Sequence, residues 1–191
     1  MFCRMISFML LISLQTAFGQ PGVETFIHMS IGMARKDAIN LFKRDWPVAE
    51  EYDTDIWTTY AVSGPVDEYL PNSFRFLIYY FGYVVGDKEL RISCLPAEAL
   101  KAFDSVRDRM TKLYGKPMAD TAKKMMGMKG IVRCISWSFP KADYKEMYKL
   151  DVAMYQVADR KTVTVQLIAF TKSYSEAMEM RENDYLHLKG R

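Results

Sequence analysis

Aromatic side chains crowd one predicted strand, and they are the residues of this sequence best suited to recognition. They are Tyr79, Tyr80, Phe81 and Tyr83. Because side chains alternate along a strand, both faces must carry aromatics. Tyrosine combines a large contact area with a polar tip, which suits a protein interface. We expect Tyr79, Phe81 and Tyr83 on an exposed face and Tyr80 on the core face; the alternative is that helices or the terminal tail cover the first face.

Two cysteines, Cys94 and Cys134, could form a disulfide if the chain enters an oxidising compartment. Both lie in predicted strands, which can be neighbours in a sheet. A disulfide needs α-carbons roughly 4.4 to 6.8 Å apart. A Cys94–Cys134 disulfide and two buried free thiols both fit the sequence.

A methionine cluster, Met125, Met126 and Met128, offers soft thioether ligands that can bind Cu(I) in exported proteins. No histidine or cysteine lies in this segment. Methionine also packs adaptably in cores and interfaces, and this is the simpler interpretation. We therefore predict no cofactor, with copper as the weaker alternative.

Catalytic signatures are missing from the sequence. It has no G-x-S-x-G elbow, H-E-x-x-H helix, phosphate loop or C-x-x-C pair, and its histidines, His28 and His187, lie near opposite ends. The acidic group between Glu50 and Asp55 lacks the glycine turn and terminal glutamate of a calcium loop, so we expect a solvated loop there. We predict that the protein is not an enzyme.

Helical and strand periodicities indicate the elements that position these residues. The pattern predicts a helix over 33–44 and a strand over 55–62. Two further strands, 74–85 and 88–95, form a hairpin around Gly86-Asp87.

The best-defined element is a helix from Pro96 to Tyr114, ended by Gly115 and Pro117. Its apolar stripe is predicted to be Leu100, Phe103, Val106, Met110 and Leu113. A connector over 116–130 precedes strands over 131–139, 148–157 and 161–170, the last two flanking Asp159-Arg160. A final helix is expected over 175–182.

The two halves of the chain show the same order of elements: a helix, a strand with a tryptophan (Trp57, then Trp137), and a hairpin. The hairpin turns at 85–88 and 157–160 also correspond. We therefore predict an α+β fold, an antiparallel sheet with helices packed on one face, and hypothesise a tandem αβββ duplication with pseudo-repeats 30–95 and 96–171.

The segment Ile31-Gly32-Met33-Ala34-Arg35-Lys36-Asp37-Ala38-Ile39-Asn40-Leu41-Phe42 resembles the glycine-methionine helix entry of small exported proteins in the BamE and β-lactamase-inhibitor-protein-like group. That group pairs short helices with three or four antiparallel strands, and the inhibitor doubles the unit. The glycine-proline pair that often follows the helix is absent. The resemblance implies a protein-binding module with no catalytic residues to carry over.

The N-terminus predicts export. Arg4 precedes an apolar run that ends at Phe18, and Ala17 and Gly19 suit signal-peptide cleavage after residue 19. The run is shorter than the roughly 20 residues that span a membrane. Residues 20–191 are then one domain, periplasmic or extracellular. A net charge of +3 with interspersed signs argues against nucleic acid as a partner.

These observations favour an exported, non-enzymatic module that binds another protein through an aromatic sheet face or edge. The first alternative is a carrier of a small ligand, lipid or metal, with a pocket lined by Trp57, Tyr80, Trp137 and nearby methionines. The second is a hydrolase without a familiar motif.

Overall fold

Strands dominate the chain, and three helices accompany them in the part that the computed structural model describes, residues 22–45, 50–53, 58–63, 74–81, 83–143, 146–172 and 176. Only the backbone is described at 44, 45, 50–53, 58–63 and 81. In chain order the elements are α2 (Val23–His28), α3 (Arg35–Asp45), β1 (Glu50–Asp53), β2 (Thr58–Ser63), β3 (Phe74–Phe81), β4 (Val84–Cys94), α4 (Pro96–Tyr114), β5 (Ala119–Lys124), β6 (Ile131–Ser138), β7 (Met147–Tyr155) and β8 (Val163–Thr171).

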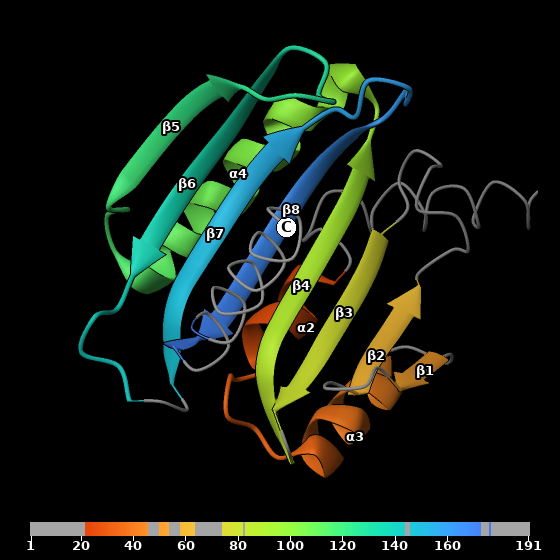
Figure 1. Ribbon diagram of the computed structural model, residues 1–191, viewed down its shortest axis with the longest axis vertical. Coiled ribbons are helices and arrows are strands. Elements are labelled where there is room, and N and C mark those ends of the chain that lie inside the picture. Colours follow the sequence, from red (N-terminus) through yellow and green to blue (C-terminus); the bar gives the residue numbers. More distant parts are fainter. Residues whose placement is uncertain are drawn as a thin grey trace, which may run out of the picture.

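Two antiparallel meanders meet at the centre of one sheet. The strand order is β1-β2-β3-β4-β8-β7-β6-β5, and each pairing is antiparallel (Figure 1). The β4–β8 ladder is the junction of the two meanders. β1 and β5 therefore form the two edges of an α+β structure.

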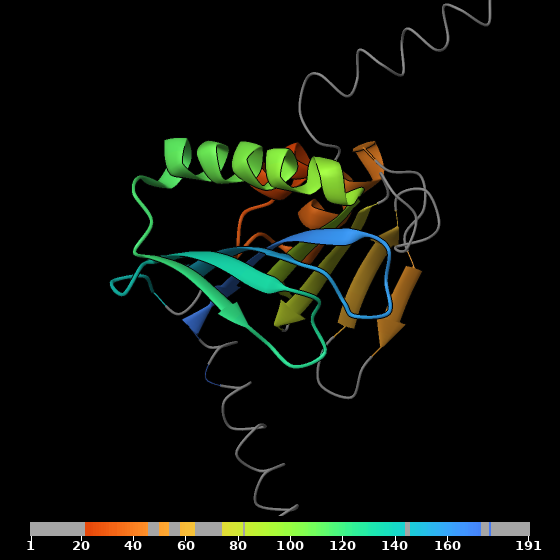
Figure 2. The same ribbon diagram turned by 90° about the horizontal axis from the view of Figure 1, so that it is seen from above.

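One face of the sheet, the core face, carries the apolar residues. The register aligns Leu90, Leu167, Val152 and Ile135 across four neighbouring strands, and all four are at most 1% exposed. Each such burial contributes about 1.5 to 3 kcal/mol. α4 packs its own buried stripe on β7, β8 and β4, and Figure 2 shows this helix lying along one side of the sheet.

α4 begins and ends where the sequence predicts, because Pro96 occupies the first turn and Gly115 adopts a φ of 81° at the C-terminal cap. The predicted stripe is partly wrong. Phe103, Val106 and Met110 are buried, but Leu100 and Leu113 are 53% and 50% exposed. The small residues Ala99 and Ala102 take the buried positions instead, which lets the helix approach the sheet closely.

The first predicted hairpin is displaced. β3 ends at Phe81 and β4 starts at Val84, so the turn lies between these residues and Gly86-Asp87 lies inside β4. Tyr80 pairs with Val85 but Tyr79 pairs with Asp87, which leaves Gly86 as the extra residue of a β-bulge. Glycine often marks such a bulge, so the residue read as a turn is a strand irregularity.

The second hairpin is confirmed, because β7 and β8 flank the turn at Ala158-Asp159. The match between the hairpin turns of the two halves is therefore wrong, since 85–88 is strand and 157–160 is turn. Two strands were not predicted: β1 in the acidic segment and β5 in the connector. The signal peptide, Trp57 and all of the expected final helix except Glu176 lie outside the described residues.

Candidate protein-binding edge

The sheet face opposite α4, the polar face, carries Tyr79 and is the face seen in Figure 1. Tyr79 is half-buried; burial raises its pKa, and the charges of Glu89 and Asp87 raise it further. Tyr80 points to the core face and is 2% exposed. The expected order of exposure for these two tyrosines therefore matches the structure.

The expected aromatic surface of Tyr79, Phe81 and Tyr83 does not lie on one strand face. Tyr83 is 87% exposed, but it belongs to the turn after β3. Phe81 ends β3, and its side chain lies outside the described part of the chain. Because the turn comes earlier than the sequence suggested, Tyr83 no longer follows the alternation that starts at Tyr79.

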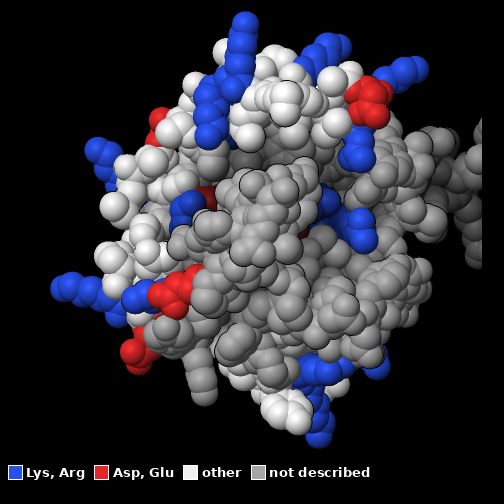
Figure 3. All heavy atoms as spheres, in the orientation of Figure 1, with Lys and Arg blue, Asp and Glu red and all other residues white. Residues whose placement is uncertain are grey.

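The centre of the polar face holds buried charge instead of exposed aromatics. Glu89 is 5% exposed, and its Oε1 accepts hydrogen bonds from Arg91 Nε and Gln166 Nε2. Burial alone would lower the pKa of Arg91, but the hydrogen bond and charge of Glu89 outweigh burial and raise it. Figure 3 shows acidic side chains recessed beside basic ones near the middle of this face. Such a satisfied group holds β4 and β8 together.

Lys88 is buried on the core face, between Asp87 and Glu89 in sequence. Its Nζ donates to the carbonyl oxygens of Phe26 and Met29 and lies 4.2 Å from the Phe26 ring centroid. These carbonyls belong to the C-terminal end of α2, where a cation is favourable. Burial lowers the pKa of Lys88 to about 7, and Asp87 opposes this shift. Lys88 therefore ties α2 to the sheet.

Of the two alternatives that the sequence leaves open for Cys94 and Cys134, the structure has free thiols and no disulfide. Cys94 belongs to the core cluster, whereas Cys134 lies on the polar face next to Ser136. Their strands, β4 and β6, are separated by β8 and β7, a distance of about 14 Å at ~4.8 Å per strand. Burial raises the pKa of Cys94 to about 11 and also raises that of Cys134, so neither is an activated thiolate.

Tyr80 and Trp137, two of the residues expected to line a carrier pocket, do not come together, and Trp57 lies outside the described residues. Trp137 is 2% exposed on the core face, and its Nε1 donates to the Gly115 carbonyl at 2.8 Å. It thereby fixes the end of α4 on β6. Tyr80 lies on β3, four strand steps from β6, or about 19 Å. The described geometry gives a pocket shared by Tyr80 and Trp137 no support.

The methionine cluster forms the end of the β5–β6 hairpin. Met126 is fully exposed and Met125 is 44% exposed, while Met128 forms an isolated backbone bridge with Val157. Copper binding at these residues stays the weaker alternative that the sequence left open. Within the described ranges, no three His, Cys, Asp or Glu side chains gather as metal ligands, and no helix is long and apolar enough to cross a membrane.

β5 is the most exposed strand in the described second half of the chain. All six of its residues are exposed, and among the described strands it pairs only with β6. The exposed apolar side chains Met118, Met125 and Met126 flank it. We call β5 together with these three methionines the β5 edge.

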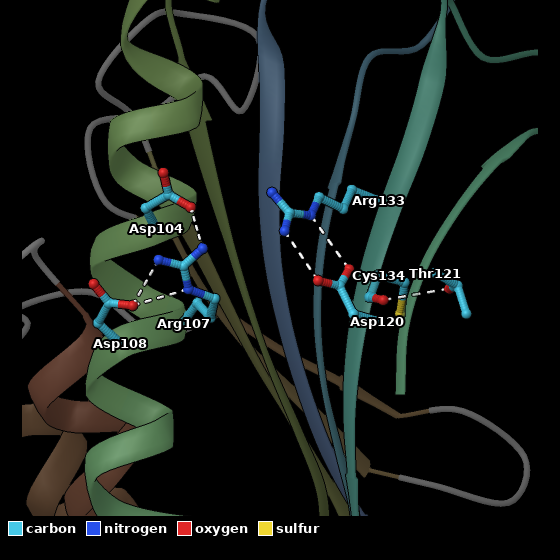
Figure 4. A network of polar contacts seen from close by, with 7 residues as sticks. All are labelled: Asp104, Arg107, Asp108, Asp120, Thr121, Arg133 and Cys134. Carbon is cyan, nitrogen blue, oxygen red and sulfur yellow. Dashed lines mark hydrogen bonds and ion pairs between the residues drawn. The ribbon is translucent and has the colours of Figure 1, made fainter. Parts of the chain in front are cut away.

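Two groups of ion pairs lie in the region of α4 and the β5 edge, one within α4 and one between β5 and β6 (Figure 4). On α4, Arg107 donates to Asp104 at 2.7 Å and to Asp108 at 2.7 and 2.9 Å. Across the gap, Arg133 on β6 donates to Asp120 on β5 at 3.0 and 3.3 Å. The hydrogen bond to Arg133 lowers the pKa of Asp120, and Arg107 adds to this shift.

Arg133 also contacts an aromatic side chain of the core. The Arg133 guanidinium lies 5.2 Å from the Phe103 ring centroid, a cation–π contact that spans β6 and α4. Thr121 also donates to the Cys134 carbonyl at 3.3 Å. The inner side of β5 is therefore paired with β6, whereas no described strand pairs with its outer side.

Sequence reasoning missed β5 because its residues are small or charged and show weak alternation. A usable signal was present beside it. Gly127 and Gly130 have φ of 76° and 80°, and two such glycines before a clear strand are typical of a hairpin turn. A hairpin turn at these two glycines implies a partner strand before it, at 119–124.

Comparison with known proteins adds no relative. No protein-family model, no curated protein and no solved structure matches this chain.

Proposed function

We propose that this protein is an exported, non-enzymatic binding module that engages another protein by accepting one of its strands at the β5 edge. The observation that carries the proposal is an edge strand with all six residues exposed and its outer side unoccupied by any described strand. Such a strand presents a row of backbone N–H and C=O groups. Strand addition to a sheet edge is an established mode of protein recognition.

The order of the elements supports a protein-binding interpretation. A helix and four strands (α3, β1–β4) are followed by a helix and four strands (α4, β5–β8), and the sheet order mirrors about the β4–β8 junction. We propose a tandem duplication in which the helices of both units share the core face. The resemblance to the BamE and inhibitor-like group, which implies protein binding, predicts such doubling.

Backbone pairing alone would bind weakly. Each hydrogen bond contributes a net 0.5 to 1.5 kcal/mol, and only alternate residues of β5 direct their backbone N–H and C=O groups toward the outer side. Association itself costs an estimated 4 kcal/mol or more. Side chains around β5 must therefore supply part of the affinity and all of the selectivity.

Proline substitution tests strand addition directly. Neighbouring residues of a strand point their N–H groups in opposite directions, so Thr121→Pro and Ala122→Pro remove one inward and one outward donor. We expect one variant to melt lower because it loses a bond to β6. The other should melt close to the unmodified protein and lose capture of the partner from the native compartment.

Lys101→Ala on α4 is the surface control and should change neither melting nor capture, since Lys101 is exposed and belongs to α4 and not to β5. Capture of a protein counts as support only if the stable proline variant abolishes it. If capture persists in both proline variants, the partner binds elsewhere and strand addition at β5 is wrong.

A further inference from the structure

We infer that the β5 edge selects an extended, acidic segment in which two adjacent carboxylates, one on each face of the strand, are flanked by apolar side chains. This inference rests on the proposed strand addition and specifies the chemistry of the partner. It follows from the charge, the side-chain sizes and the apolar residues that surround the open side of β5.

The β5 edge and the residues next to it carry a net positive charge, because the one carboxylate of β5, that of Asp120, is already paired with Arg133. Lys116, Lys123, Lys124 and Lys129 are all exposed, and none takes part in an ion pair between described residues. Asp120 is held by two hydrogen bonds from Arg133. An incoming strand therefore meets lysines without a counter-charge.

The lysines lie on both faces of the edge. Register places Lys124 opposite Ile131, on the core-face side with Asp120, and Lys123 opposite Val132, on the polar-face side with Thr121. A strand added beside β5 has its own side chains on both faces. Carboxylates at neighbouring positions of the partner could pair with one lysine on each face, since cross-strand charge pairs lie within reach.

Small and apolar residues complete the recognition surface. Between the charges, β5 carries Ala119, Thr121 and Ala122, which leave room for larger partner side chains. Exposed apolar residues lie at its two ends: Met118 at 72%, Met126 fully exposed and Ile131 at 60%. Methionine adapts its shape to different partners, so these residues suit the apolar positions of the segment.

Lysines on an edge strand also discourage unwanted pairing, and that role alone would explain Lys123 and Lys124. It would not explain large apolar side chains exposed beside them. A protective edge is expected to lack such side chains, whereas a binding edge needs them for affinity. The combination of lysine and exposed methionine at β5 favours binding of an acidic partner.

Three synthetic peptides test the inference on the purified protein by fluorescence anisotropy. The first has two adjacent glutamates flanked by valines, and the second replaces each glutamate by lysine. The third is the glutamate peptide with every backbone nitrogen methylated, so that neither of its edges can donate hydrogen bonds. We expect measurable binding for the first only. Lys123→Ala/Lys124→Ala should weaken it about three- to tenfold, and salt should weaken it further.

The control double variant is Lys101→Ala/Lys112→Ala, which removes two exposed lysines of α4 and should leave peptide affinity unchanged. Equal binding of the glutamate and lysine peptides would overturn the acidic selectivity while leaving strand addition in place. Binding that survives N-methylation would overturn strand addition as well. The absence of binding to any peptide would overturn the acidic selectivity. The proline variants would then be the separate test of the proposed strand addition.

A second copy of the chain is the competing occupant, because the other edge, β1, has the acidic sequence Glu50-Glu51-Tyr52-Asp53. Sedimentation of the protein alone decides between them. We expect a monomer at the concentrations used for peptide binding. Self-association that Lys123→Ala/Lys124→Ala abolishes would overturn the inference of a separate acidic partner.

Discussion

Strands β4 and β5 are both rich in charge, yet they occupy opposite situations in the sheet. In β4, Asp87, Lys88 and Glu89 are at most 5% exposed. In β5, every residue is exposed, Lys123 and Lys124 included. The same residue types therefore have different roles, which depend on the position of their strand in the sheet.

The two strands differ in where the partner of each charged side chain comes from. A buried charge must find its partner inside the fold, because losing water without one is expensive. Glu89 has Arg91 and Gln166, and Lys88 has two carbonyls of α2. An exposed lysine has water as its partner and can exchange it for a carboxylate of another molecule. Central charge is structural, and edge charge is available for recognition.

The largest effect is expected beside β4, on β3. Tyr80→Ala removes a side chain that is 2% exposed and should lower the free energy of unfolding by about 3 to 5 kcal/mol. Tyr79→Ala, on the half-buried polar face, should cost less. Urea denaturation of both variants measures the difference. A larger loss for Tyr79→Ala would show that the assignment of the two faces is reversed.

Removing the carboxylate of Glu89 tests whether central charge is structural. Glu89→Ala should cost about 2 kcal/mol, less than the 3 to 5 of a fully buried pair, because Arg91 is 36% exposed. Glu89→Gln keeps an oxygen acceptor and should cost less. If denaturation finds Glu89→Ala within about 0.5 kcal/mol of the unmodified protein, the contrast between β4 and β5 fails.

The buried amine of Lys88 should make stability depend on pH. Its pKa is lowered from 10.5 to about 7 by burial, so the unfolded chain binds more protons between these values. The free energy of unfolding should therefore rise with pH above 7, by at most about 1.4 kcal/mol per unit. Above pH 9 the raised pKa of Cys94 acts in the opposite direction, so the useful window is pH 7 to 9.

Lys88→Met separates this contribution from the rest of the protein. The variant should show a flatter pH dependence in thermal melts over the same window, although it also loses the two bonds to α2. Identical slopes for the variant and the unmodified protein would mean that Lys88 does not titrate there.

The smallest effect is expected at the edge. Asp120→Asn removes the charge that Arg133 holds, but Asp120 and Arg133 are 49% and 31% exposed. Exposed pairs contribute about 0 to 1 kcal/mol, so the melting temperature should change little. A loss as large as that of Glu89→Ala would place β5 among the structural strands and weaken the case for an available edge.

The sequence predicts the elements that have strong local signals. α4 follows from Pro96, the apolar stripe and Gly115, and three strands of the second half follow from alternation. Leu100 and Leu113 were misplaced, because periodicity cannot tell which side of a broad apolar stripe meets the sheet. The bulge at Gly86 was read as a turn, since glycine favours both.

The candidate site was the least predictable part. Whether Cys94 and Cys134 meet depends on strand order, and that order is decided by the distant β4–β8 pairing. The availability of β5 depends on its being last in the sheet, which no local pattern encodes. Aromatic residues drew attention to β3, yet a central strand has both edges paired and offers little backbone to a partner.

The β4–β8 ladder also has a consequence for the order of folding. It joins residues about 70 to 80 positions apart in the chain, whereas each meander pairs strands that follow closely. During synthesis and folding the first meander is complete well before β8 exists, so β4 is then a temporary edge. Its consecutive charges, Asp87, Lys88 and Glu89, are poor templates for pairing with a foreign strand. We therefore expect these charges to limit aggregation of the half-formed sheet until β8 covers it.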